Sequence, residues 1–414
     1  MSALAQRLQQ VQKAVHREDG RLLASYVSLP VRAGEDLSPA NMELAKACVA
    51  SGDYKRSVKQ ALGHSDIGAV VGECMGALVG IVRRDWRACF EAEKAAYSAL
   101  LEYFKENNWV IPVLKTLSEE LRLLAIIVDV GSRMSDNEHL REAEMLLKAG
   151  FTLVAKDRTP VTQPTAKKLA IFVVTNVLFK IYFKLNTLHN ATKIINVVEG
   201  PGTVLGNLSP FPACDVVTYK YYIGRLRMFE DNFEEARECL QLALRRTPLA
   251  KLRNRQRILA SLIPVEMSLG VFPTLNIAAT YGLDEYYVLA RAAMQGNLRD
   301  FEDCMQMHRV SFIRLGVFLV LERVKVICYR NLFKKVFSVM DSSRLPLAAF
   351  QSAINWLAPE EVSLDEVECT LANLIFQKKL NGYINHEHRL VVVSKKNPFP
   401  NTHLIKPYEP EENN

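Results

Sequence analysis

The sequence lacks the long apolar runs and the leader that membrane or secreted proteins carry. Its longest apolar stretches, residues 171–183 and 312–321, contain Lys180 and Arg314. They fall short of the roughly 18 uncharged residues that span a bilayer. The first 15 residues place apolar side chains on one helical face, and no small-residue cleavage site follows. We therefore expect neither a signal peptide nor a membrane partner.

Closely spaced cysteine pairs are also missing. The eight cysteines lie far apart without a C-x-x-C pair, and most stand among apolar residues in helical segments. This pattern predicts reduced, buried thiols in the cytosol or nucleus rather than a disulfide framework. With 49% hydrophobic residues the chain can bury a large core, and its net charge of +7 is mild for 414 residues.

Catalytic motifs are absent as well. The sequence contains no G-x-x-x-x-G-K-[ST] phosphate loop, no H-E-x-x-H and no G-x-S-x-G. His386 and His388 could both face a metal, but two imidazoles without a third ligand nearby make a poor site. We expect no enzyme, no metal and no cofactor.

Apolar residues recur every three or four positions through most of the chain, which indicates helices. Loops rich in Gly and Pro interrupt them at residues 29–41, 156–165 and 199–215. The last loop has three Gly and three Pro in seventeen residues and is the predicted domain boundary.

Two helical segments, residues 142–150 and 235–243, echo one another. Around the second, Gly224, Ala236, Leu240, Ala243 and Pro248 fall at the spacing of the small and apolar positions of a tetratricopeptide (TPR) hairpin. We therefore predict stacked helical hairpins, with chance similarity between amphipathic helices as the alternative.

Four glycines recur at every fourth position on one helical stripe, at positions 68, 72, 76 and 80. Each costs roughly 1 kcal/mol relative to Ala in a helix interior. The row therefore predicts close backbone packing. A membrane dimer motif is disfavoured, because Glu73, Arg83, Arg84 and Asp85 lie beside it.

The end of the chain changes character. Pro346 fits the first turn of a helix that runs to about Leu357, and Ser363 with Glu366 forms a capping box for a second helix. The strand-like run 389–394 then follows a polar turn at 385–388. Helix, helix, capped helix and two-stranded hairpin is the order of a winged helix, in which the hairpin covers the core face of the last helix.

Several segments resemble the PCI-domain subunit of TREX-2, the transcription-coupled mRNA export complex: residues 177–189, 218–229, 262–270, 327–336 and 390–400. We predict a mostly α fold, a right-handed solenoid of TPR-like helical hairpins followed by a C-terminal winged helix, the PCI domain. Its predicted parts are N-terminal repeats 1–205, the helical part of the PCI domain 206–340, the winged helix 341–396 and a Pro-rich, acidic tail 397–414. The resemblance implies two protein partners, a large TREX-2 scaffold subunit and a small acidic DSS/Sem-type protein, and a nuclear location, possibly at nuclear pores.

One basic stretch lies where two predicted hairpins join. It holds six cations and no acid, namely Arg245, Arg246, Lys251, Arg253, Arg255 and Arg257. Such a stretch is either a solvated helix face or a site for a polyanion, either nucleic-acid phosphate or an acidic protein. The resemblance favours the acidic subunit.

A second basic group gathers near the winged helix: Arg323, Arg330, Lys334, Lys335, Lys378, Lys379, Arg389, Lys395 and Lys396. Arg323, Arg330 and Lys334 share one helical face. The predicted recognition helix, however, begins with Asp365, Glu366 and Glu368, which would repel phosphate in a major groove. We expect binding to RNA or DNA backbone without regard to sequence.

Three function classes remain at this point. The first is a non-enzymatic scaffold subunit of a nuclear mRNA export complex. The second is a PCI scaffold of a signalosome- or proteasome-lid-like complex without nucleic-acid binding. The third is a winged-helix transcription regulator. Phosphate binding by several Lys and Arg weakens steeply as salt rises, whereas apolar subunit packing does not, so salt dependence separates them.

Overall fold

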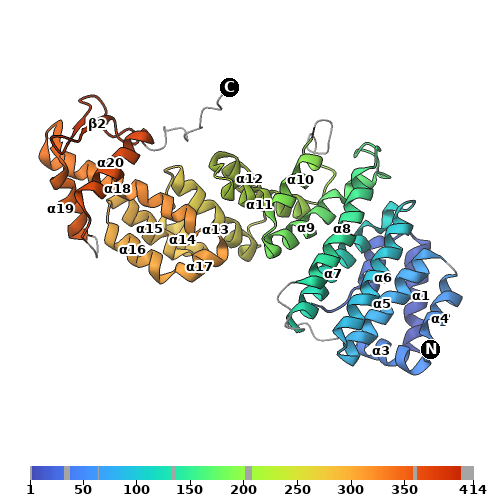
Figure 1. Cartoon of the computed structure of the whole chain (residues 1–414). Coiled ribbons are helices and arrows are strands. Elements are labelled where there is room, and N and C mark those ends of the chain that lie inside the picture. Colours follow the sequence, from blue (N-terminus) through green and yellow to red (C-terminus); the bar gives the residue numbers. More distant parts are fainter. Residues whose placement is uncertain are drawn as a thin grey trace. The chain divides into compact units, whose positions relative to one another are not determined.

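The computed structural model describes residues 2–31, 38–63, 65–131, 137–200, 208–357 and 361–401. The chain forms two compact units, unit 1 over residues 1–219 and unit 2 over residues 220–414 (Figure 1). Residues 201–207 of the predicted boundary loop and 402–414 of the predicted tail lie outside the described part.

Unit 1 is helical, and from α5 to α9 each helix packs against the next along the chain. Figure 1 shows these helices side by side, coloured from blue to green. Its elements are α1 (Ala3–His16), α2 (Gly20–Val27), α3 (Pro39–Ser51), α4 (Tyr54–Leu62), α5 (Asp66–Arg83), α6 (Trp86–Phe104), η1 (Asn108–Val110), α7 (Ile111–Gly131), α8 (Glu138–Ala155), η2 (Lys167–Ala170), α9 (Ile171–Leu185) and α10 (Leu188–Val198). The division between the units falls within α11 (Ala213–Phe229).

The glycine stripe lies on α5. A Cβ on Gly80 would lie 3.0 Å from the backbone nitrogen of Cys89 on α6, so only glycine allows the two helices to approach this closely. Gly68 and Gly76 also face close neighbours, whereas Gly72 has ordinary van der Waals space. The prediction of close backbone packing is confirmed for Gly68 and Gly80, whereas the close neighbour of Gly76 is the Tyr54 side chain.

Unit 2 begins with the remainder of α11 and continues as α12 (Phe233–Arg246), α13 (Leu252–Ser268), α14 (Leu275–Tyr281), α15 (Asp284–Gln295), α16 (Leu298–Met307), α17 (Arg309–Leu315) and α18 (Phe318–Met340). A Cβ on Gly224 of α11 would lie 2.6 Å from Cγ of Leu240 on α12, and Ala236 and Leu240 are fully buried. The close approach predicted from the TPR spacing is therefore confirmed for this hairpin.

The winged helix closes unit 2. It consists of β1 (Arg344–Pro346), α19 (Leu347–Leu357), α20 (Leu364–Phe376), β2 (Gly382–Asn385) and β3 (Leu390–Val393). The strands form an antiparallel sheet in the order β1-β3-β2, with Leu345 opposite Val391 and Ile384 opposite Val391.

The prediction for Pro346 was wrong. Pro346 ends strand β1, and α19 starts one residue later, so the sheet has three strands rather than two. Proline is tolerated here because β1 is an edge strand, where a missing N–H leaves no ladder bond unmade. The next residue, Leu347, donates its backbone N–H to the Arg389 carbonyl at 2.9 Å.

The capping box on α20 is confirmed. The Ser363 hydroxyl accepts from the Glu366 backbone N–H at 3.3 Å, and the Glu366 carboxylate accepts from the Ser363 backbone N–H at 2.7 Å. On the opposite face Val367, Leu371 and Leu374 are fully buried. The sheet and the two preceding helices thus share one core with α20.

The structure bears on the expectations about membrane spans and about cysteines. Among the described helices, none is long and apolar enough to cross a membrane. Six of the eight cysteines are buried, whereas Cys214 and Cys369 are exposed; all eight are free thiols.

Candidate nucleic-acid and acidic-partner interface

The first basic stretch covers the turn from α12 to α13. Five of its six cations are exposed: Arg245, Arg246, Lys251, Arg253 and Arg257. Leu249 and Leu252 lie among them with 74% and 57% of their surface exposed. The turn therefore presents both positive charge and apolar surface.

Arg255 does not belong to this surface. Its Nε donates to the Tyr281 hydroxyl at 2.8 Å, and its Nη1 donates to the backbone carbonyls of Leu244 and Thr247 at 3.1 and 2.9 Å. The guanidinium thus caps the carbonyl end of α12, where a cation is favoured by the helix dipole. Its role in ligand binding stays a prediction, and the structure shows its guanidinium engaged in three hydrogen bonds within the protein.

We expect Arg255→Glu to destabilise the protein by about 2–3 kcal/mol, because three hydrogen bonds are lost and a carboxylate is placed at a helix C-terminus. Arg253→Glu makes the same charge change two residues earlier, on an exposed side chain. Its stability should stay within about 0.5 kcal/mol of that of the parent protein. Thermal unfolding of both variants checks this. Equal melting temperatures would show that the capping bonds do not contribute.

Two of the predicted cations on α18, Arg323 and Arg330, differ in their exposure to solvent. Arg323 forms an ion pair with Asp231 at 2.5 Å and lies over the Phe233 ring. Arg330 is buried, with 7% of its surface exposed, and donates to the carbonyls of Phe399 and Pro400 at 2.9 and 2.7 Å. Burial lowers the pKa of Arg330 from its usual value. The prediction that Arg330 contributes to an exposed basic face was wrong.

Arg330 instead holds the segment that follows β3, residues 394–401, which we call the returning segment. This returning segment contacts α18: besides the Phe399 and Pro400 carbonyls that Arg330 holds, the Phe399 ring lies 5.9 Å from the Phe337 ring. Lys395 and Lys396 lie on this returning segment, while Lys334 and Lys335 lie on the last turns of α18. All four lysines are exposed and form no ion pair with the described residues. We call them the lysine surface.

Three other predicted residues have different environments. Lys378 is exposed and precedes Asn381, which bonds Pro398 of the returning segment at 2.8 Å. Lys379 is partly buried and donates to Gln377 at 2.8 Å, and burial lowers its pKa to about 8. Arg389 is exposed but stands before β3, at the other end of this strand from Lys395, so the structure does not bring it to the lysine surface.

The start of α20 remains acidic. Asp365 and Glu366 are exposed, and the Glu368 carboxylate shares a hydrogen bond with Nδ1 of His386 in the β2–β3 turn at 2.9 Å. His386 therefore has a carboxylate partner, and the described residues contain no cluster of three metal-ligating side chains. A negative helix start disfavours docking in a major groove.

Comparison with known sequences agrees with this architecture. The chain matches the profile described as "PCI domain" over residues 298–395 and the profile "PSMD3-like, N-terminal TPR repeats" over residues 143–282. It is 33% identical to PCI domain-containing protein 2 of Danio rerio over 408 residues, which cover 96% of this chain and 97% of the relative. It is 32% identical to the protein of the same name from Xenopus laevis, over 95% of this chain and 97% of the relative. The chain belongs to the PCI domain-containing protein family.

This PCI protein has further exposed residues that its sequence did not reveal. Arg344 on edge strand β1 is exposed and stands opposite Val392, three residues before Lys395. Trp356 on α19 and Tyr383 on β2 are 80% and 62% exposed. Arg344 was missed because β1 was predicted as a helix start. Both aromatic side chains belong to elements of the winged helix.

Proposed function

We propose that the chain is a non-enzymatic scaffold subunit of a TREX-2-like nuclear mRNA export complex. Its helical repeats hold the large scaffold subunit and the small acidic DSS/Sem-type protein, and its winged helix contributes a basic surface to nucleic acid. Family membership supports the scaffold role, and the sequence resemblance described above supports the choice of complex. The observation that carries the nucleic-acid part is the lysine surface.

The lysine surface fits a phosphate backbone better than bases. Lysine presents a compact, hydrated point charge, which attracts phosphate without fixing orientation. No exposed aromatic side chain accompanies the four lysines in sequence at positions 334–335 and 395–396, so base stacking is not provided by them. Exposed Lys378 and Arg344 can add positive charge that attracts the same phosphate backbone. Binding of this type depends on salt and not on sequence.

The α12–α13 turn fits an acidic protein chain better than RNA. Its exposed cations attract carboxylates, while Leu249 and Leu252 offer apolar contacts that a phosphate backbone cannot use. This combination supports the acidic DSS/Sem-type protein as its occupant. The lysine surface and this turn are therefore assigned to different partners.

The nucleic-acid role is tested with Lys334→Glu combined with Lys335→Glu. Fluorescence anisotropy with a labelled single-stranded RNA should show weaker binding and a smaller salt dependence, since each lost phosphate contact removes about 0.7 from the slope of log K against log salt. Lys46→Glu combined with Lys59→Glu makes the same charge change at exposed positions in unit 1 and serves as control. An equal loss of RNA affinity in both double variants would show that only the net charge of the protein matters and not the position of the lysines.

A second candidate function has its own support. Exposed Trp356 and Tyr383 favour a PCI scaffold whose winged helix packs on sister subunits, as in a signalosome- or proteasome-lid-like complex, without nucleic-acid binding. In that case the lysine variants bind RNA as the parent does, while Trp356→Ala abolishes assembly in a manner insensitive to salt.

A further inference from the structure

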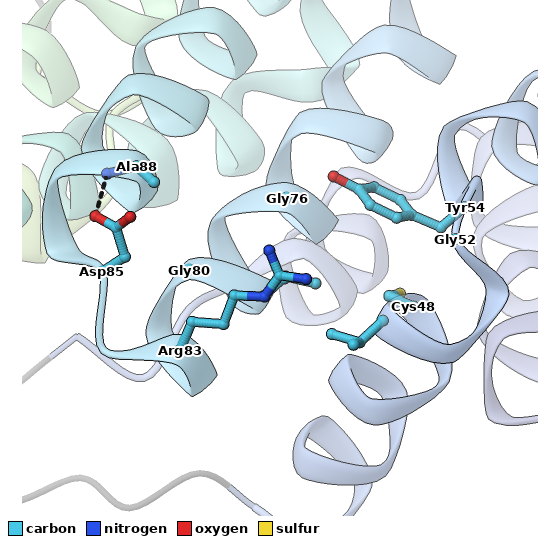
Figure 2. Close-up of a pocket in the computed structure, with 10 residues that line it drawn as sticks. Cys48, Gly52, Tyr54, Gly76, Gly80, Arg83, Asp85 and Ala88 are labelled. Carbon is cyan, nitrogen blue, oxygen red and sulfur yellow. Dashed lines mark hydrogen bonds between the residues drawn. The ribbon is translucent and has the colours of Figure 1, made fainter.

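Unit 1 contains a surface cavity of about 320 Å³ beside α5. Its lining includes Cys48, Tyr54, Gly76, Gly80, Arg83 and Asp85. Figure 2 shows the Arg83 guanidinium reaching from the end of α5 into the space in front of Gly76, Tyr54 and Cys48. The volume is at the lower end of the range for small-ligand pockets and suits a single side chain or a small molecule.

The glycines determine the shape of this cavity. A Cβ on Gly76 would lie 2.9 Å from the Tyr54 hydroxyl oxygen, so the bare backbone of α5 lets the Tyr54 ring end against it. Gly80 is required for the close approach of α6, as described above. The bare backbone of Gly76 and Gly80 therefore forms part of the cavity wall.

The Arg83 guanidinium at this cavity is not paired with a carboxylate of the described residues. Arg83 forms no ion pair or hydrogen bond with the described residues, and neither does the Tyr54 hydroxyl. Asp85 lines the same cavity, but Figure 2 shows its carboxylate turned to the Ala88 backbone. As the N-cap of α6, this carboxylate accepts a hydrogen bond from the Ala88 N–H at 2.9 Å. Glu73 is engaged by Lys55 at 2.5 Å.

A second cavity in unit 1 provides a contrast. It measures about 470 Å³, and its lysines already have acidic partners: Lys115 pairs with Asp215 at 2.5 Å, and Lys180 pairs with Glu119 at 2.9 Å. Its charges are thus neutralised within the protein. At the Arg83 cavity the guanidinium is left for a ligand.

We propose that this cavity binds a carboxylate side chain from an acidic segment of a partner protein. The planar guanidinium forms paired hydrogen bonds with a carboxylate, and the Tyr54 hydroxyl donates a third. A phosphate dianion fits less well, because Asp85 adds negative charge to the wall. Arg84 and Arg87 are exposed, have no ion pair with described residues and neighbour the lining residues Arg83, Asp85 and Ala88 in sequence, so they can attract flanking acids of the same partner chain.

This site is separate from the function proposed above. It lies in unit 1 and requires no RNA, and the basic α12–α13 turn lies in unit 2. Because that turn also attracts acidic chains, the test uses full-length protein with and without Arg253→Gln and Arg257→Gln. The probe is a fluorescein-labelled seven-residue peptide of glycine and glutamate, compared at fixed ionic strength with the same peptide carrying glutamine.

Arg83→Gln should weaken binding of the glutamate peptide at least about tenfold, since a bidentate charged pair is lost. Arg83→Lys should give an intermediate loss, because it keeps the charge without the planar fork, and Arg21→Gln, an exposed arginine of α2 outside the cavity, should stay within about twofold. Tyr54→Phe should weaken binding by about threefold while preserving the ring, so it remains informative if an Arg83 variant fails to fold.

Three outcomes would overturn the proposal. The first is no saturable binding of the glutamate peptide, or equal binding of the glutamine peptide. The second is equal affinity of Arg83→Gln and Arg21→Gln. The third is loss of binding only when Arg253 and Arg257 are changed, which would place the acidic chain on the α12–α13 turn and leave the proposed function intact.

Discussion

Replacing Leu371 with aspartate is expected to unfold the winged helix. Leu371 is fully buried on the inner face of α20, between Val367 and Leu374. Truncating a buried leucine costs about 2–5 kcal/mol, and burying a carboxylate without a partner adds to that loss. We therefore expect a destabilisation of at least about 4 kcal/mol, seen as a lower melting temperature and as loss of amide protection in β2 and β3.

Ala372→Asp is the matched control. It introduces the same side chain at the next position of α20, where the residue is exposed, and should change stability by about 0.5 kcal/mol or less. If Leu371→Asp melted together with Ala372→Asp and kept the strand amides protected, the inner face of α20 would not be the core of the winged helix.

The winged helix could be predicted largely because its signals are local. Ser363 and Glu366 are three residues apart, and each forms half of the capping box. The run from Leu390 to Val393 reads as a strand by itself. The Gly224 and Leu240 spacing likewise predicted a helix contact, because a hairpin of known type fixes which positions meet.

Strand β1 could not be predicted in the same way. It has three residues, and its partner β3 lies far along the chain, since Arg344 pairs with Val392, 48 positions further on. A three-residue segment shows no periodicity, and Pro346 taken alone favours a helix start. The pairing is decided by the tertiary contact, which leaves Leu345 fully buried.

The exposure of charged residues is the part of the candidate site that could not be predicted from the sequence. Arg255, Arg330 and Lys379 look like their exposed neighbours in the sequence, yet the fold buries them to different degrees. Arg330 and Arg255 are held by backbone carbonyls, and in Arg330 these come from residues about 70 positions away. Clusters of Lys and Arg can thus be located from sequence, but which members face solvent depends on carbonyls that distant segments bring to them.

Arg330 therefore links the stability of the protein to its proposed surface for RNA. Arg330→Met keeps most of the side-chain length but leaves the Phe399 and Pro400 carbonyls without their donor. We expect a loss of about 2 kcal/mol in stability, because two hydrogen bonds from a charged group disappear. The returning segment should then detach, and hydrogen exchange at Asn381 and Ser394 should accelerate, since their N–H groups bond across it.

RNA affinity of the same variant should fall severalfold although no exposed charge is removed, because the segment that carries Lys395 and Lys396 is no longer held on α18. Arg323→Met on α18 is the control: it removes the exposed ion pair of Arg323 with Asp231, which lies between α11 and α12, and this pair is worth less than about 1 kcal/mol. Anisotropy measured well below both melting temperatures separates affinity from unfolding. Faster exchange at Asn381 with unchanged RNA affinity would show that the returning segment does not form part of the nucleic-acid surface, because its two lysines would then be dispensable.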